Sequence, residues 1–371
     1  MAYICCFFLS ALFVKIGSIK ENQNKKILAG LCFMAGLLVT AILAGVRDYS
    51  IGTDVRGYGN VWFQRAVSST DAYGYVKWGT SSQVGVVYML LNYTVSRFTD
   101  NAHWFYFVLA LLINYLVFCG VYSCKDEIDI SLAMLVFYFL FYNNTLNLLR
   151  QSLAIAIIIS GFKFVKKRQF IKYSLCVTVA FLTHSTAFVG IAVYFLYHSY
   201  KMKYSKLIRF GISAGLLGVA VFYQSILNFV IKLGFLGTRY SFYVLDYESG
   251  GRLIRIFLFC LPWIIYFFMV YKKAYSNDGY AQFWILILTC SSMMTLIMFS
   301  NSAALRITYY FDYFFIIMIP WIAEKYRIKE KQHKNINLTF VLILIYLLVY
   351  WGIVYVYQNH GQTVPYMIFT I

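Results

Sequence analysis

The chain contains 371 residues, of which 61% are hydrophobic, 20% are aromatic and 12% are charged. A composition this apolar excludes both a soluble globular domain and a disordered chain. The formal net charge is +18, which is typical of a membrane protein with Lys and Arg in its cytoplasmic loops. No basic helix carries interleaved base-stacking aromatics, so we expect no nucleic-acid partner.

Apolar runs recur along the whole chain, and they are continuous rather than alternating, which predicts helices rather than the strands of a barrel. We therefore expect an all-α polytopic integral membrane protein with about 10–12 transmembrane or re-entrant helices and short loops. Residues 1–371 are expected to form a single membrane domain. The runs lie at residues 2–19, 27–46, 84–96, 102–123, 131–142, 147–165, 173–197, 207–232, 253–271, 281–300, 307–323 and 336–357.

Lysine-rich connectors fix the expected orientation. The positive-inside rule places them in the cytoplasm, and they lie at residues 15–26, 166–172, 201–206, 271–273 and 324–334. The N-terminus and the remaining connectors are then outside, at residues 47–101, 143–150, 233–252 and 301–306, followed by the C-terminal tail.

Two of the apolar runs do not fit the expectation that each run is one helix crossing the membrane once. The run at 84–96 is short and both its flanks are expected outside, so we interpret it as an interfacial or re-entrant helix within the outer loop 47–101. The run at 173–197 has basic connectors at both ends. It either crosses once or folds into a hairpin around Thr183, His184 and Ser185, and the hairpin satisfies the charge rule.

The 8 cysteines are scattered, mostly within apolar runs, and no Cys-x-x-Cys or Cys/His ligand spacing occurs. They are expected to be small apolar packing residues rather than disulfide partners or metal ligands. The opening MAYICCFFLSALFVK has no basic n-region and no small-x-small cleavage site, so we interpret it as a first span and not a signal peptide.

Arginine and lysine are distributed unequally between the two expected faces. Lysine suits a solvated anchor, whereas arginine suits bidentate recognition of phosphate or carboxylate. The outer side is therefore expected to bind an anion, although headgroup contacts and pairing with Asp also explain any single arginine. The outer arginines are Arg47, Arg56, Arg65, Arg97, Arg150, Arg239, Arg252, Arg255 and Arg306.

The stretch GVRDYSIGTDVRGYGNVW, residues 45–62, directly follows an apolar run. Arg47, Asp48, Asp54 and Arg56 lie within it, and glycines allow the chain to turn sharply. The stretch is interpreted either as a capped loop with paired charges or as a charged rim over a pocket.

A second polar group lies in NNTLNLLRQ, residues 143–151. At helical spacing, Asn143, Asn147, Arg150 and Gln151 share one face, and an apolar run follows them. An arginine at or inside the membrane is a functional candidate, and interhelical hydrogen bonding by a polar stripe is the alternative.

Three further groups complete the candidates. His184 lies within an apolar run and has a side chain suited to general-base catalysis near neutral pH, but a structural hydrogen bond is the commoner role. Arg306 opens a span that contains Asp312. The outer loop 237–255 carries Asp246-x-Glu248, a weak metal motif that also fits charge pairing with Arg239 or Arg252.

At these residues the sequence resembles the EpsG-like family of polytopic membrane proteins. The resemblance is carried in order by GVRDYSIGTDVRGY, NLLRQSLAIAI, FLTHSTAFVGIAVYFL and LRITYYFDYFFIIMIP, over roughly residues 27–323. It implies a multi-pass protein of the bacterial inner membrane whose site faces the outside. It also implies Wzy-type polymerisation of lipid-linked repeat units in exopolysaccharide, capsule or O-antigen synthesis.

For such a reaction the growing glycan moves from undecaprenyl diphosphate to a sugar hydroxyl of the next lipid-linked unit. Fixed arginines would stabilise the leaving diphosphate, so we expect neither a metal nor a cofactor. His184 is the first choice of base and Asp54 the second. The expected partners are the lipid-linked oligosaccharide, the bilayer, a chain-length regulator and a flippase. The expected diphosphate ligands are Arg47, Arg150, Arg306, Arg239 and Arg252, with further substrate contacts from Gln151, Asn147, Asp48 and Tyr58.

Two other functions stay open at this point. A flippase of lipid-linked oligosaccharide would also use a cationic cavity, but with charges spread through the core. A glycosyltransferase that uses a polyprenyl-phosphate sugar would use an acid-x-acid metal site, for which the outer loop 237–255 offers Asp246-x-Glu248.

Overall fold

The computed structural model describes residues 1–82, 84–199, 256–266, 279–297, 305–330 and 338–369, with isolated helical positions between 207 and 229. The chain divides into two compact units, residues 1–188 with 315–371 and residues 189–314. All named elements are helices, and the described residues contain one isolated antiparallel bridge, between Arg47 and Ile368. The fold is therefore all-α, which confirms the expected class.

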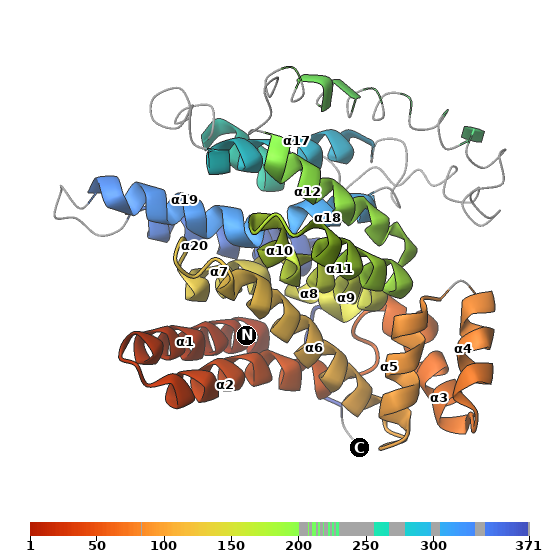
Figure 1. Cartoon of the computed structure of the whole chain (residues 1–371). Coiled ribbons are helices and arrows are strands. Elements are labelled where there is room, and N and C mark those ends of the chain that lie inside the picture. The colour runs from red at the N-terminus through yellow and green to blue at the C-terminus, as the bar shows by residue number, and fades with distance from the viewer. Residues whose placement is uncertain are drawn as a thin grey trace. The chain divides into compact units, whose positions relative to one another are not determined.

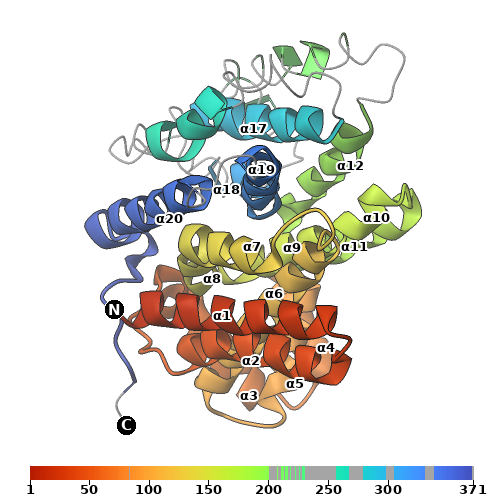
Figure 2. The ribbon, with the colours of Figure 1, turned by 90° about the vertical axis from the view of Figure 1, so that its left-hand side faces the viewer.

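The first unit contains long apolar helices (Figure 1). Within the described chain, 4 helices are long and apolar enough to cross a membrane. α1 (Ala2–Asn22) and α2 (Lys26–Gly45) lie side by side in both views (Figures 1 and 2), and α6 (Ala102–Tyr122) packs on α2. The fourth is α20 (Leu338–Trp351), continued by the π-helix η7 (Gly352–Tyr357).

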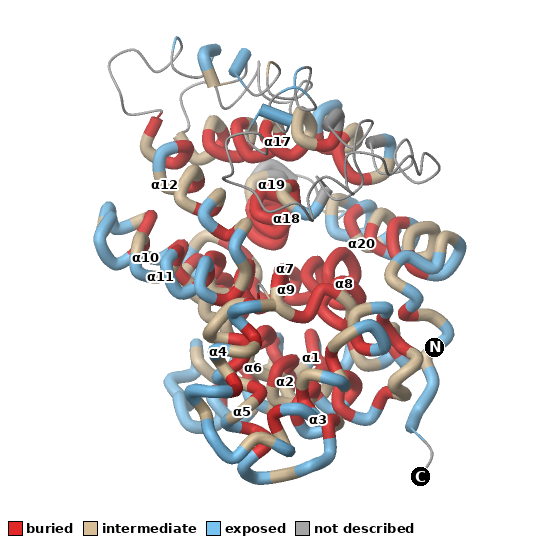
Figure 3. Tube along the Cα trace, turned by 90° about the vertical axis from the view of Figure 1, so that its right-hand side faces the viewer, coloured by how far each residue is buried: buried red, intermediate tan, exposed pale blue. Residues whose placement is uncertain are grey.

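A helical hairpin with Leu148 at its tip forms the buried centre of this unit. The first arm contains α7 (Ile130–Phe137), the π-helix η2 (Tyr138–Tyr142) and α8 (Asn143–Asn147). The second arm contains α9 (Leu149–Ser160) and α10 (Phe162–Lys166). The backbone leaves the helical region at Leu148, where φ is −85° and ψ is 61°. Almost every residue from 130 to 146 is buried (Figure 3).

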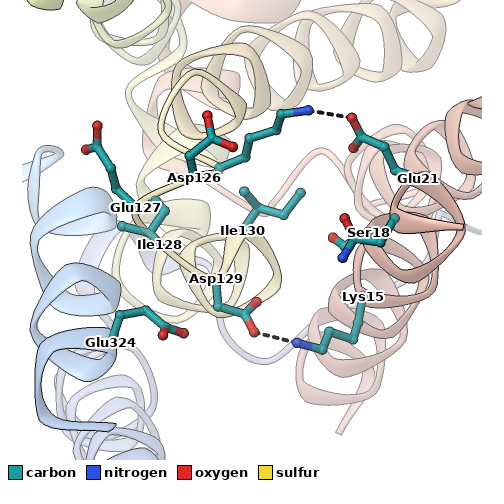
Figure 4. A pocket seen from close by; sticks show the side chains of 11 residues that line it. Lys15, Ser18, Glu21, Asp126, Glu127, Ile128, Asp129, Ile130 and Glu324 are labelled. Atoms are coloured by element: carbon teal, nitrogen blue, oxygen red, sulfur yellow. Dashed lines mark hydrogen bonds and ion pairs between the residues drawn. The ribbon is translucent and has the colours of Figure 1, made fainter. Parts of the chain in front are cut away.

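Ion pairs hold the ends of these helices together at what we call the basic end of the unit. Lys166 Nζ lies 2.6 Å from Glu127 Oε1, which brings the end of α10 back to the start of α7. Lys15 pairs with Asp129 and Lys125 pairs with Glu21, each at 2.5 Å. Figure 4 shows the last two pairs beside a cavity of about 430 Å³. Lys15 and Lys166 belong to connectors that the positive-inside rule assigns to the cytoplasm.

Short helices fill the segment between α2 and α6. They are the π-helix η1 (Val55–Gly59), α3 (Asn60–Ser68), α4 (Ala72–Ser81) and α5 (Val86–Ser96). Asp71 caps α4 by accepting hydrogen bonds from the backbone N–H groups of Tyr73 and Gly74. With 11 residues, α5 is about 16 Å long and too short to cross a bilayer.

The run at 173–197 is interrupted at His184. α11 (Phe170–Thr183) ends there, and His184 is extended with φ −151° and ψ 121°. The 3-10 helix η3 (Ser185–Gly190) and α12 (Ile191–His198) follow. The break lies where the sequence predicted it for a hairpin, and α12 belongs to the second unit.

The described part of the second unit includes the π-helix η5 (Ile256–Cys260), α17 (Gly279–Ile297) and α18 (Leu305–Asp312). Asp312 is fully buried and accepts hydrogen bonds from Ser291 (2.5 Å) and Thr308 (2.9 Å). The chain returns to the first unit through α19 (Phe315–Glu330), which packs on α7.

Candidate functional site

The end of the first unit opposite to the basic end gathers three segments that are distant in sequence. They are the loop after α2 with η1 and α3 (46–62), the hairpin tip (147–150) and the C-terminal segment (359–369). We call this region the arginine end, because Arg47, Arg56 and Arg150 all lie in it. The directions of the helices explain why these segments lie opposite to the basic end. α2 starts at Lys26 and ends at Gly45, and α9 starts beside Leu148 and leads toward Lys166.

A close backbone approach joins the loop to the hairpin tip. Gly52 has a φ of +92°, and a Cβ added there would lie 2.5 Å from the carbonyl oxygen of Leu146. Only glycine fits this position without strain. The amide oxygen of Asn147 then accepts hydrogen bonds from the Thr53 hydroxyl at 2.7 Å and from the Asp54 backbone N–H at 3.1 Å. These contacts place Asp54 next to the start of α9.

Arg150 lies against two aromatic rings of the same segment. Its Cζ atom is 5.0 Å from the ring centre of Tyr58 and 5.0 Å from that of Trp62. The two rings contact each other with centroids 4.4 Å apart. Cation–π contacts of this kind hold a guanidinium plane in one orientation.

An acid completes this cluster. The Tyr58 hydroxyl donates a hydrogen bond to the Asp54 carboxylate. Burial and the neighbouring Asp54 raise the pKa of Tyr58, and Arg150 opposes the rise. The phenol therefore stays protonated and acts as a donor. The structure thus brings Asp54 and Tyr58 of the stretch 45–62 together with Asn147 and Arg150 of the stretch 143–151.

Arg47 lies at the same end but is buried, with 1% of its surface exposed. Its Cζ atom is 4.9 Å from the ring centre of Tyr106. The Nε and Nη1 atoms have no hydrogen-bond partner among the described residues, and burial lowers the pKa of the guanidinium. A cavity of about 10 Å³ beside it is also lined by Tyr106 and Thr145, which is about the size of one water molecule.

The C-terminal segment covers Arg47 and is joined to the loop after α2 by backbone hydrogen bonds. The backbone N–H of Phe369 donates to Val46 at 3.0 Å, that of Asp48 donates to Met367 at 2.9 Å, and that of Gly52 donates to Gln362 at 3.1 Å. The Gln362 side chain accepts a hydrogen bond from Arg56. Direct contact between Arg47 and a substrate therefore requires this segment to move.

Asp48 has a local role in the structure. The backbone N–H of Ser50 donates to its Oδ1 at 2.8 Å, and hydrogen bonding by Ser50 lowers the pKa of Asp48. Gln151 follows Arg150 in the first turn of α9 and is buried. The predictions that both residues contact substrate stay untested.

His184 directly follows α11, and its Nδ1 lies 2.9 Å from the Thr186 hydroxyl. The carbonyl oxygen of the preceding residue, Thr183, lies close to the start of α5. A Cβ added to Gly85 would lie 2.2 Å from this oxygen. Since α11 begins near the basic connector 166–172, its far end points away from the basic end.

Three more predicted diphosphate ligands lie outside the described part of the first unit. Arg306 lies in α18 of the second unit, and Arg239 and Arg252 lie outside the described residues. Two outer arginines have structural contacts: Arg97 donates to the carbonyls of Ala66 and Val67, and Arg65 stacks on Trp78.

Trp62 contacts Arg150 and Gln362 contacts Arg56, and neither residue was among those predicted from the sequence. Trp62 lies four residues after Tyr58, one helical turn away, and this spacing was a usable signal. Gln362 is distant in sequence from its contacts, and no local pattern marks it.

The described residues hold no group of three or more His, Cys, Asp or Glu side chains placed to bind a metal ion. Asp246 and Glu248, the pair considered for a metal, lie outside the described part of the chain.

These observations define an all-α polytopic membrane protein with an arginine-centred polar cluster at one end of its helices. The chain belongs to the EpsG family, whose model matches residues 29–368. No curated protein and no solved structure matches it. Family membership places the chain among the membrane proteins of polysaccharide biosynthesis, a group associated with glycosyltransferase-like polymerases.

Proposed function

We propose that the protein polymerises lipid-linked oligosaccharide repeat units at the outer face of the bacterial inner membrane. The observation that carries this proposal is the position of Arg150 against Tyr58 and Trp62, near Asp54, at the end opposite to the basic end. A guanidinium that two aromatic rings hold in one orientation presents its N–H edge to an anion, as recognition of a diphosphate requires.

In the proposed reaction, the bond between the sugar C1 and the diphosphate oxygen of the growing chain breaks. The diphosphate leaves with the bonding electron pair, and a hydroxyl oxygen of the next lipid-linked unit forms the new bond to C1. Negative charge grows on the leaving oxygen in the transition state, so a fixed cation beside it lowers the barrier. Arg150 is the proposed ligand of this group, and the reaction uses no metal.

The proton of the attacking hydroxyl needs an acceptor. Asp54 lies in the same cluster as Arg150, which supports it as the base. His184 is the alternative, at the end of α11. Asp54→Asn keeps the size of the side chain and removes its basicity, so it should abolish polymerisation if Asp54 is the base. His184→Ala should do so if His184 is.

The test is the size distribution of lipid-linked and surface glycan in cells that lack the gene. We expect single repeat units in place of long chains, restored by the wild-type gene and not by Arg150→Ala. Repeat units retained on the cytoplasmic side would instead indicate a flippase. Incomplete repeat units would indicate a glycosyltransferase that adds one sugar. Either result would refute the polymerase.

A further inference from the structure

Asp54 lies at the start of a helical segment but does not cap it. Helical residues begin at position 53 and continue as η1, and the Asp54 side chain makes no capping hydrogen bond. An aspartate at a helix start commonly accepts hydrogen bonds from the backbone N–H groups of the first turn. Asp71 and Asp129 do so at the starts of α4 and α7. The Asp54 carboxylate instead accepts a hydrogen bond from the Tyr58 hydroxyl, inside the candidate site.

The hairpin tip supplies the cap that Asp54 does not. The Oδ1 atom of Asn147 accepts a hydrogen bond from the Asp54 backbone N–H at 3.1 Å and another from the Thr53 hydroxyl at 2.7 Å. Since a backbone N–H only donates, the atom that faces it is the amide oxygen. On the other side of the amide, a Cβ added to Gly361 would lie 3.1 Å from Nδ2. The helical turn is therefore capped by a residue 93 positions away, whose amide has a defined orientation.

The hairpin contacts this helical segment at two points, and each point fixes a different group. Asn147 binds the backbone at Asp54. Arg150, three residues later, lies against the rings of Tyr58 and Trp62. Removing the Asn147 side chain releases the Asp54 backbone and leaves both rings beside the guanidinium. The position of the carboxylate can therefore be perturbed separately from the orientation of Arg150.

We propose that Asn147 is a positioning residue for the reaction: it caps the turn in place of Asp54 and holds the Asp54 carboxylate where it accepts the proton of the attacking hydroxyl. The inference rests on the proposed function, in which Asp54 is the base. In this role Asn147 acts through Asp54, and not as the substrate contact expected from the sequence. A general base works only within hydrogen-bond reach of the proton that it removes, so a small displacement of the carboxylate lowers the rate.

The test compares Asn147→Ala with Asn101→Ala in the full-length protein in lipid nanodiscs. Asn101 caps α6, and its Oδ1 accepts hydrogen bonds from the His103 backbone N–H at 2.9 Å and from the Tyr49 hydroxyl at 3.4 Å. Each variant thus removes an amide oxygen shared by one backbone N–H and one hydroxyl. The measurements are kcat and KM with a lipid-linked repeat unit, the affinity for inorganic pyrophosphate by calorimetry, and the midpoint of thermal unfolding.

Asn147→Ala should lower kcat roughly 10- to 100-fold, the size of effect that a displacement of about 1 Å produces. KM and the pyrophosphate affinity should stay at the wild-type values, because Arg150 keeps both rings. One cap contributes little of the total stability, so both variants should fold, with similar falls in the unfolding midpoint. Asn101→Ala should keep the wild-type kcat.

The outcomes separate this inference from the proposed function. If Asn147→Ala keeps the wild-type kcat while Asp54→Asn is inactive, the role of Asn147 is refuted and Asp54 stands as the base. If Asn147→Ala also loses pyrophosphate affinity, or Asn101→Ala loses as much kcat, the effect is structural and the inference is again refuted. If Asp54→Asn keeps the wild-type kcat, the inference fails together with the choice of base, but the polymerase stands. If the wild type does not elongate the lipid-linked unit, the proposed function itself fails.

Discussion

Replacing Trp62 by leucine tests whether the aromatic contacts orient Arg150. The variant removes one of the two rings that lie 5.0 Å from the guanidinium and leaves the charge and Tyr58 in place. A cation–π contact contributes about 0.5–1 kcal/mol at an exposed site and about 2 kcal/mol when desolvated. Arg150 and Trp62 are both half-buried, so the loss should lie between these limits, at about 1–2 kcal/mol.

This loss corresponds to a reduction of roughly 5- to 30-fold in kcat/KM, because it acts on the orientation of the group that stabilises the leaving diphosphate. The assay follows chain length against time, with purified protein in lipid nanodiscs and a lipid-linked repeat unit as the substrate. Trp62→Phe keeps an aromatic face and should retain most of the activity.

Trp78→Leu is the matched control. Arg65 lies 4.8 Å from the ring centre of Trp78, so this variant removes a similar cation–π contact from the neighbouring helix α4. It should lower the unfolding midpoint about as much as Trp62→Leu and leave polymerisation unchanged. Equal activity losses in the two variants, or full activity in Trp62→Leu, would refute the orientation argument.

The remaining predictions concern three other contacts of the arginine end. Arg150→Lys keeps the charge but not the planar guanidinium, so chain elongation should fail nearly as completely as in Arg150→Ala; normal polymer length would exclude bidentate binding. Gly52→Ala should lower the free energy of unfolding by about 2 kcal/mol or more through its positive φ and the Leu146 carbonyl, whereas Gly57→Ala, with no atom within 4 Å of the added Cβ, should be neutral in thermal unfolding. Truncation before Asn359 should leave the protein in the membrane fraction but abolish polymer, because it removes the bonds that hold the 46–52 loop; polymer of normal length from the truncated protein would show that the segment is dispensable.

The helical class, the main spans and the grouping of lysines followed from the sequence. The runs at 2–19, 27–46 and 102–123 correspond to α1, α2 and α6. The runs at 131–142 and 147–165 are the two arms of the hairpin. An apolar run in a membrane must pair its backbone groups within the run, and it therefore forms a helix. Hydropathy and charge are for this reason enough to locate these helices in the sequence.

The sequence identified several members of the site but not their arrangement. Arg150, Asn147 and Asp54 were selected from two separate motifs, and Tyr58 was included as a substrate contact. Nothing local indicated that Asn147 binds the backbone of Asp54, 93 positions earlier in the chain. Arg47 was expected to be a ligand at the outer surface, and the fold buries it beneath the C-terminal segment.

The sequence by itself therefore determined which stretches are apolar enough to form membrane helices, and the family to which the chain belongs. The tertiary structure decided which side chains meet. A span's apolar character depends on consecutive residues, whereas the contacts of Arg150 and the covering of Arg47 depend on how segments from distant parts of the chain pack against one another.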